Sequence, residues 1–293
     1  MAILMFVIKT KRKKPGVIYM LNLASADVVH AGVLPFKIFY FSRRNWAFGP
    51  GMCHFATTTF FCNMYCSILL LTAISIDRFL AVVYPMQSLS WRTLRRASVV
   101  CVAVWLIAIA GVIPLFTIEL MHHIPQLNIT TCFDVPAFSL YMKRFHYYLL
   151  ILHIFFFFVP LLISTSCYVC IIRKLSSFNG AAQPGKKRRS ILLSAAVLCS
   201  FIVCFGPTCI LSLVQGVWPT QQWENLYVAH VLCLCIGTIN CCIDPLIFYY
   251  ASSECQKQVW NLLCQRKHSV LVKDLWITSS NRSARGLDHS SQA

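Results

Sequence analysis

The chain has 293 residues, of which 58% are hydrophobic and only 12% charged, and its formal net charge is +17. So little polar side chain cannot cover a water-soluble globule of this length, which excludes an ordinary soluble domain. The positive charge lies in alternate connections between apolar stretches, so loop bias explains it and no nucleic-acid partner is expected.

The apolar stretches are long enough to cross a hydrocarbon core of about 30 Å, which requires about 20 residues of helix. We therefore predict an all-α, polytopic membrane helix bundle. Basic residues at 9–14, 92–96 and 186–189 mark the cytosolic connections by the positive-inside rule. The six complete spans are expected at 16–40, 52–84, 97–116, 145–175, 190–218 and 224–250.

The segment 1–8, ahead of these spans, is apolar but would be only about 12 Å long as a helix. If the basic residues at 9–14 are cytosolic, Met1 would lie inside the membrane. We therefore expect 1–8 to be the inner end of a first helix whose upstream part is absent from this sequence. A six-span protein with both ends cytosolic is the alternative. The bundle with its loops would then cover 9–251.

Polar residues within the spans are the next signal, because each needs a partner or a polar cavity. Asp27 lies mid-span, Ser67 in the next span, and Asn240 and Asp244 in the last. Carboxylate, hydroxyl and amide oxygens around one cavity would suit a sodium ion, the one possible cofactor. A hydrogen-bonded cluster with one protonated aspartate is the alternative reading.

Asp77 and Arg78 lie side by side near the cytosolic end of the 52–84 span. An arginine at a helix centre in the membrane costs about 2.5–3.5 kcal/mol on insertion scales, so we expect this pair to have a function. Pro160, Pro207 and Pro245 can kink the later spans, which favours a switching bundle over packing alone.

The long loop after the third span is expected to be extracellular. Cys132 in this loop and Cys53 at the start of the second span both lie in the oxidising compartment, and we predict a disulfide between them. Asn128 begins an Asn-Ile-Thr glycosylation pattern in the same loop. No catalytic motif is recognisable, so an enzyme is not expected.

After the last span, residues 252–264 mix polar and apolar side chains and predict an interfacial amphipathic helix on membrane lipids. Cys264 at its end is a candidate palmitoylation site, with an unmodified thiol as the alternative. The serine-rich segment 265–293 predicts a disordered cytosolic tail.

Taken together, these motifs resemble the rhodopsin-type family of G-protein-coupled receptors. In that family a first helix precedes the six spans, a heterotrimeric G protein and arrestin bind at the cytosolic end, and the protein lies in the plasma membrane. The matching residues are Asp77-Arg78-Phe79, Trp105, Pro160 with Tyr168, Cys204-Phe205-Gly206-Pro207, and Asp244-Pro245 with Phe248.

Within the family, the chain resembles the protease-activated receptors, especially the thrombin-receptor subtype. The stretches that carry this resemblance include 33–38, 62–65, 78–93, 129–135 and 249–255. The resemblance implies that a serine protease cuts an amino-terminal arm and exposes a tethered peptide agonist. This sequence lacks such an arm. A truncated, non-signalling membrane partner and a receptor for a diffusible peptide or lipid are the alternatives.

The resemblance also implies roles for individual residues. Asp134 would receive the charged part of the peptide, unless it is only a solvated turn residue, and Tyr227 would line the pocket. Phe61 and His230 stand where relatives carry tyrosines, so ligand preferences should differ.

At the inner end, Phe248 lacks the hydroxyl that meets Tyr168 in relatives. Lys187 cannot hold Arg78 as an acid would, so we expect Asp77 to restrain it. Activation would be an outward pivot below Pro207 that frees Arg78 for the G protein.

Overall fold

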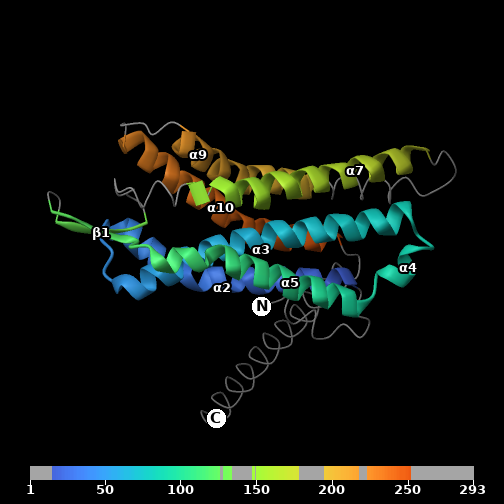
Figure 1. Ribbon diagram of the computed structural model, residues 1–293, viewed down its shortest axis with the longest axis horizontal. Helices are drawn as coiled ribbons and strands as arrows, with labels where there is room; N and C mark the ends of the chain where they lie inside the picture. The colour runs from blue at the N-terminus through green and yellow to red at the C-terminus, as the bar shows by residue number, and fades with distance from the viewer. Residues whose placement is uncertain are drawn as a thin grey trace, which may run out of the picture.

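A computed structural model shows the chain as an elongated bundle of helices that run lengthwise (Figure 1). It describes residues 15–125, 128–133, 147–148, 150–177, 195–217 and 223–251, with side chains except at 177, 215–217, 223–227 and 247–251. Six helices in these ranges are long and apolar enough to cross a membrane, which confirms the predicted fold class. They are Pro15–Arg43, Gly49–Val83, Leu94–Thr117, Leu150–Ser176, Ala195–Val214 and Val228–Leu246.

The main helices are α2 (Pro15–Arg43), α3 (Gly49–Val83), α5 (Leu94–Val112), α7 (Val159–Ser177), α9 (Gly206–Val217) and α10 (Trp223–Ala251). The central one is α3, which packs against α2, α5 and α7, while α10 packs against α2 and α9. A side-chain bond joins α5 to α2, where Trp105 Nε1 donates to Asn22 Oδ1 at 3.1 Å. The predicted stub at 1–8, the helix at 252–264 and the tail at 265–293 lie outside the described residues.

Two helices are preceded by a π-helical turn. One turn (Ile154–Phe158) leads into α7 and the other (Phe201–Phe205) leads into α9. Pro160 and Pro207 occupy the second position of the helix that follows each turn. A proline has no N–H to donate, and the wider turn accommodates the interrupted hydrogen-bond ladder. Pro245 lies inside α10.

A two-stranded hairpin, which we did not predict, covers the end of the bundle opposite α4 (Ser88–Trp91) (Figure 1). Its antiparallel strands are β1 (Met121–Ile124) and β2 (Ile129–Cys132). The 3₁₀ turn Ile113–Thr117 extends α5 towards the hairpin. The hairpin marks the outer end of the bundle and α4 the inner end, because the basic connection that contains α4 is cytosolic by the positive-inside rule.

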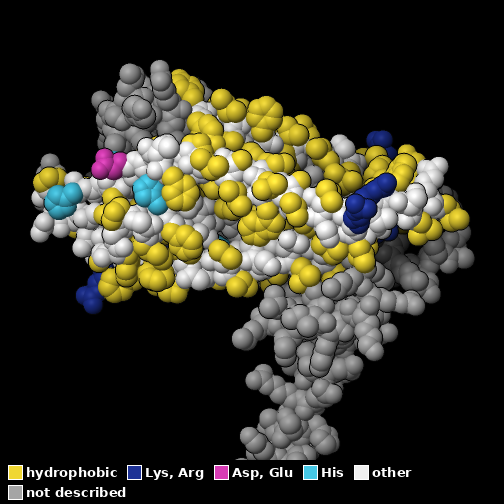
Figure 2. Space-filling view, turned by 60° about the horizontal axis from the view of Figure 1, so that its bottom comes forward, with side chains coloured by type: hydrophobic (Ala, Val, Ile, Leu, Met, Phe, Trp, Pro, Cys, Tyr) yellow, Lys and Arg dark blue, Asp and Glu magenta, His cyan; other side chains and the backbone are white. Residues whose placement is uncertain are grey.

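Apolar side chains fill the interior and also cover the outside. Leu23, Ile68 and Phe201 are fully buried, whereas Ile38 and Leu162 are 66% and 68% exposed. Figure 2 shows hydrophobic side chains over the middle of one face, with lysines and arginines towards the two ends. Such a surface suits hydrocarbon, where helices satisfy their own backbone hydrogen bonds.

Candidate functional site

The inner end of α3 carries the Asp77-Arg78 pair. Asp77 is 7% exposed, and its carboxylate accepts two hydrogen bonds from Arg92: Nε to Oδ1 at 2.7 Å and Nη2 to Oδ2 at 2.7 Å. This two-point contact is the strong form of the arginine–carboxylate pair. A Cβ at Gly16 of α2 would lie 3.9 Å from Arg78 Nη2 and 4.0 Å from Asp77 Oδ2, so both side chains also lie beside the start of α2.

The described ion-pair partner of Asp77 is therefore Arg92, and restraint of Arg78 by Asp77 stays a prediction. Asp77 points into the protein and pairs with Arg92, whereas the Arg78 side chain is exposed. The hydrogen bonds that Arg92 donates to Asp77 raise the pKa of Arg92 against the opposing effect of partial burial, so the guanidinium stays charged at physiological pH.

Local structure sets the position of Arg92. The residue ends α4, where its backbone N–H bonds to the carbonyl of Ser88 at 2.8 Å. The next residue, Thr93, caps α5 by accepting from the backbone N–H of Arg96 at 3.3 Å. Arg92 is thus held between two defined helix ends, directly against the inner end of α3.

Two hydroxyl contacts tie α7 to α3 near this pair. The Ser75 and Tyr168 hydroxyls lie 2.8 Å apart, and the Ser164 and Thr72 hydroxyls 3.4 Å apart. Tyr168 is 4% exposed and lies close enough to Arg78 for the two side chains to interact electrostatically. The structure thus brings Tyr168 to the Asp77-Arg78 region. Phe248 lies in α10, but its side chain is outside the described set.

The predicted polar cluster lies buried in the middle of the bundle. Asp27 is 7% exposed, and Ser67, Asn240 and Asp244 are 0% exposed. Asn240 Nδ2 donates to Asp244 Oδ2 at 2.7 Å, and the two carboxylates are close enough to interact electrostatically. The structure adds Asn63, which lies one helical turn before Ser67. The Asn63 side chain interacts with Asp27.

The oxygens of this cluster fit a small hard cation. Each of the five residues has one buried oxygen without a hydrogen-bond partner among the described residues: Asp27 Oδ1, Asn63 Oδ1, Ser67 Oγ, Asn240 Oδ1 and Asp244 Oδ1. Buried polar atoms are normally satisfied, so these oxygens are available to an ion or to water. Oxygen ligands with carboxylate charge are what sodium-like cations require.

Aromatic rings surround the inner side of Pro207. Phe205 is 1% exposed, and its ring centroid lies 6.1 Å from that of Phe201, which lies 5.4 Å from that of Phe157. The neighbouring α10 approaches closely at Gly237. A Cβ there would lie 3.2 Å from the ring of Phe60 and 3.6 Å from the carbonyl oxygen of Cys204.

The predicted disulfide between Cys53 and Cys132 is present, with Cα atoms 5.8 Å apart. It holds the end of the hairpin over α3. The next residue, Phe133, adopts φ +66° and donates its backbone N–H to the Leu120 carbonyl at 2.8 Å. The ring of Phe133 is therefore held at the mouth of the bundle.

Phe133 brings together the two described members of the predicted ligand set. Its ring centroid lies 5.5 Å from that of Phe61 on α3 and 5.6 Å from that of His230 on α10. Asp134 lies outside the described residues, as does the side chain of Tyr227. Phe133 was not among the predicted ligand residues, although its position directly after Cys132 was an available signal.

Of the two predicted modification sites, the structure describes Asn128 and not Cys264. Asn128 is exposed in the hairpin turn at the outer end, with φ +50°. That position is accessible to a glycosylating enzyme. Cys264 lies outside the described residues.

A bundle of membrane-crossing helices, with a charged pair at its inner end and a disulfide-anchored hairpin over its outer mouth, defines a polytopic helical membrane protein. The family model described as 7 transmembrane receptor (rhodopsin family) matches residues 1–248. The chain belongs to this family. It is therefore a multi-pass receptor of the plasma membrane, and not an enzyme.

Three individual relatives show which receptors of this family the chain is similar to. The chain is similar to Proteinase-activated receptor 1 of Homo sapiens, with 56% identity over 272 residues, 92% of this chain and 64% of the relative. The Xenopus laevis protein of that name is 52% identical over 270 residues, 92% and 64% of the two chains. A purinoceptor of Gallus gallus is 39% identical over 251 residues, 83% and 69%. The chain thus spans 64% of the length of the first of these relatives.

Proposed function

We propose that the chain is the transmembrane part of a receptor that a serine protease activates, through a tethered peptide agonist, to signal to heterotrimeric G proteins. The observation that carries this proposal is the 56% identity to Proteinase-activated receptor 1 across 92% of the chain. The residues around Asp77 at one end and Phe133 at the other support it, because they supply an inner and an outer site joined by α3 and α10.

At the outer end, the agonist peptide would meet Phe133, Phe61 and His230. The disulfide fixes Phe133 in place, so the peptide would bind a prepared surface at a lower entropic cost. Asp134, next to Phe133, would receive the positive charge of the peptide, and Tyr227 would line the same region. Contacts with His230 on α10 would transmit the binding event to that helix.

At the inner end, Asp77 would stay fixed by Arg92 while Arg78 changes partners. The π-helical turn before Pro207 is a natural pivot, because the hydrogen-bond ladder is already interrupted there. An outward pivot below Pro207, past Phe205, would open a groove beside Arg78 for the carboxyl-terminal helix of a G protein. Tyr168 and Phe248 would line this groove, and Pro245 would let α10 adjust.

A sodium ion in the polar cluster would be held by Asp27, Ser67, Asn240 and Asp244, with Asn63 as a fifth residue. When bound, the ion would supply positive charge that neutralises the two carboxylates. The chain's own residues would do the coupling, since Asp27 lies on α2, Asn63 and Ser67 on α3, and Asp244 on α10. Drawing these helices together would favour the resting arrangement.

Further partners and modifications follow from the same proposal. Arrestin would bind the activated inner end, and the basic inner connections would favour anionic lipids of the inner leaflet. Asn128 would carry a glycan, and Cys264 a palmitoyl group.

The experiment joins the chain to the amino-terminal arm and first helix of the human relative and expresses the fusion in cells without other receptors of this type. Thrombin should then raise intracellular calcium. A fusion with an uncleavable arm should respond only to a soluble agonist peptide. If an unrelated lipid evokes calcium release and neither thrombin nor peptide does, protease activation is ruled out.

A further inference from the structure

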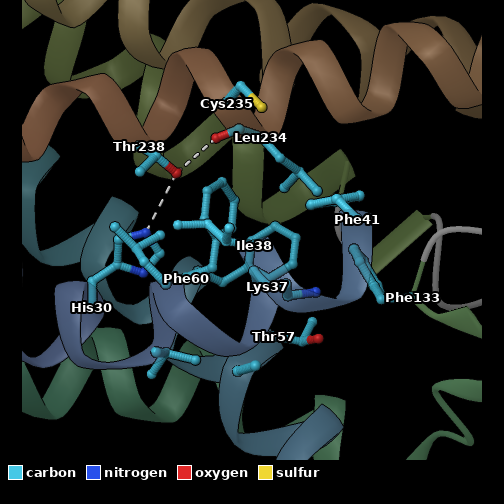
Figure 3. Close-up of a pocket in the computed structure, with 14 residues that line it drawn as sticks. His30, Lys37, Ile38, Phe41, Thr57, Phe60, Phe133, Leu234, Cys235 and Thr238 are labelled. Atoms are coloured by element: carbon cyan, nitrogen blue, oxygen red, sulfur yellow. Dashed lines mark hydrogen bonds between the residues drawn. The ribbon is translucent and has the colours of Figure 1, made fainter. Parts of the chain in front are cut away.

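The two ends of the bundle expose different side chains. At the outer end, Phe60 and Phe133 line an apolar cavity that belongs to the proposed agonist site (Figure 3). At the inner end, the connection that contains α4 is basic. The segment 84–98, from the end of α3 into the start of α5, contains three arginines and no aspartate or glutamate. By the positive-inside rule this segment faces the cytosol, where ATP and protein kinases are present.

One exposed hydroxyl of this segment lies on extended backbone. Thr93 lies between α4 and α5 with φ −95° and ψ 153°, and its side chain is exposed. The two exposed serines of the segment, Ser90 and Ser98, lie within α4 and α5. A protein kinase must place the target hydroxyl in line with the γ-phosphate of ATP inside its cleft. An extended residue between two helices reaches such a cleft more readily than a residue within a helix.

The Thr93 hydroxyl is also chemically available. Its oxygen accepts one hydrogen bond, from the backbone N–H of Arg96 at 3.3 Å. Its hydrogen is donated to none of the residues that the structure describes, so a catalytic base can remove it. The Ser90 hydroxyl, by contrast, donates to the carbonyl of Gln87 at 2.9 Å. Thr93 therefore differs from Ser90 in both backbone conformation and hydrogen bonding.

The neighbouring charges favour one class of kinase. Arg92 precedes Thr93, and Arg95 and Arg96 follow it with exposed side chains. Arginines without a nearby acid are complementary to an acidic substrate cleft, and kinases select substrates by such charge patterns. Arg92 is bound to Asp77, so Arg95 and Arg96 are the two that a cleft would contact. Because α4 is only four residues long, it can open to admit the kinase.

We infer that Thr93 is phosphorylated by a serine/threonine kinase with an acidic substrate cleft. Thr93 Oγ1 forms a bond to the γ-phosphorus of ATP, while the bond from that phosphorus to the bridging oxygen of ADP breaks. The hydroxyl proton passes to the catalytic aspartate of the kinase, and ADP leaves. The phosphate adds a charge of about −1.5 to −2 at neutral pH, which offsets the exposed charges of Arg95 and Arg96. It would therefore weaken the attraction of the inner end for anionic lipids.

The test incubates the full chain in phosphatidylcholine nanodiscs with ATP and the catalytic domain of protein kinase C. Mass spectrometry then locates and quantifies phosphate on each residue over time. Phosphate should appear on Thr93 faster than on Ser90 or Ser98. Thr93→Ser, which keeps both the hydroxyl and the helix cap, should still be modified at this position, and Thr93→Val should not.

A pair of double variants tests the charge recognition. Arg95→Gln with Arg96→Gln should lower kcat/KM at Thr93 about 5- to 10-fold, because each exposed charge pair contributes a few-fold. Arg43→Gln with Arg44→Gln removes the same charge from the outer end and should leave the rate unchanged. Unfolding temperatures verify that both variants are folded. Absence of phosphate on Thr93, or equal rates for the two double variants, would overturn the inference. The measurement needs neither agonist nor G protein, so its outcome is independent of the proposed function.

Discussion

Arg92 binds the carboxylate of Asp77 with both Nε and Nη2, each at 2.7 Å. The contact joins the central helix to the connection between α4 and α5. It also leaves Arg78, the next residue on α3, exposed at the inner end. The two charges of the pair therefore differ in their surroundings: Asp77 is bound to Arg92 of the connection, and the Arg78 side chain is exposed.

This relationship can be measured with a double-mutant cycle on Asp77→Asn and Arg92→Gln. Each single variant should lower the free energy of unfolding of the purified chain, because it leaves a partly buried group without its partner. The coupling energy should be about 1–3 kcal/mol. Arg95→Gln, which removes an exposed charge from the same connection, should change stability by less than about 0.5 kcal/mol. Additive effects of the two single variants would show that the pair is not energetically coupled.

The disulfide gives a second expectation. Replacing Cys53 and Cys132 together by alanine should cost about 2–5 kcal/mol of stability, since the bridge closes a loop of 79 residues. It should also weaken binding of a soluble agonist peptide, because Phe133 would no longer be held against Phe61. Thermal unfolding and peptide competition measure the two effects. Cys242→Ala, at an exposed free cysteine, is the matched control. Unchanged peptide affinity in the double variant would rule out the role given to Phe133.

Gly237 and Gly32 offer a matched pair of helix glycines. A Cβ at Gly237 would lie 3.2 Å from the buried Phe60 ring, whereas nothing lies within 4 Å of one at Gly32. Gly32→Ala should leave stability unchanged or raise it by up to about 1 kcal/mol, because glycine is the poorer helix former. Gly237→Ala should lower stability, and Gly237→Val should lower it further. Equal unfolding temperatures for the two alanine variants would show that α10 does not need this close approach.

Much of the fold could be predicted from the sequence because membrane-spanning segments must have an apolar composition. Every span must be apolar over about 20 residues, so the helix ends fell within a few residues of those observed. The disulfide could be predicted as well, because the charge of the connections placed Cys53 and Cys132 on the same, extracellular side of the membrane. The hairpin could not be predicted, because its two four-residue strands carry little pattern of their own. Its position depends on the disulfide and on Trp46, whose backbone N–H donates to the Thr130 carbonyl at 2.8 Å.

The site was predicted less completely. Buried charges such as Asp77 and Asp244 stand out in an apolar span, whereas Arg92 is one of several arginines in a basic loop. Only the helix ends on either side of it select Arg92 over Arg95 as the partner of Asp77. Asn63 was overlooked because a single amide carries a weaker signal than a charge, although its spacing of four residues from Ser67 placed it on the same helix face.

The polar cluster leads to an expectation about sodium. The unfolding temperature of the chain should rise in sodium chloride relative to choline chloride at equal ionic strength, because an ion that binds only the folded state stabilises it. Asp27→Asn should remove this difference, since it removes one of the two carboxylate charges. Ser25→Ala, at an exposed position on the same helix, should preserve it. The same sodium effect in Asp27→Asn would contradict a cation at this site.

The role of Arg78 is tested most directly by G-protein turnover. The fusion carrying the human arm and first helix is reconstituted with a heterotrimeric G protein, and agonist-stimulated nucleotide exchange is recorded for Arg78→Ala beside Arg95→Ala. Arg78→Ala should reduce exchange to the level without agonist, while peptide binding and unfolding temperature stay close to those of the parent. Arg95→Ala should exchange normally. Full exchange by Arg78→Ala would mean that this arginine does not receive the G protein.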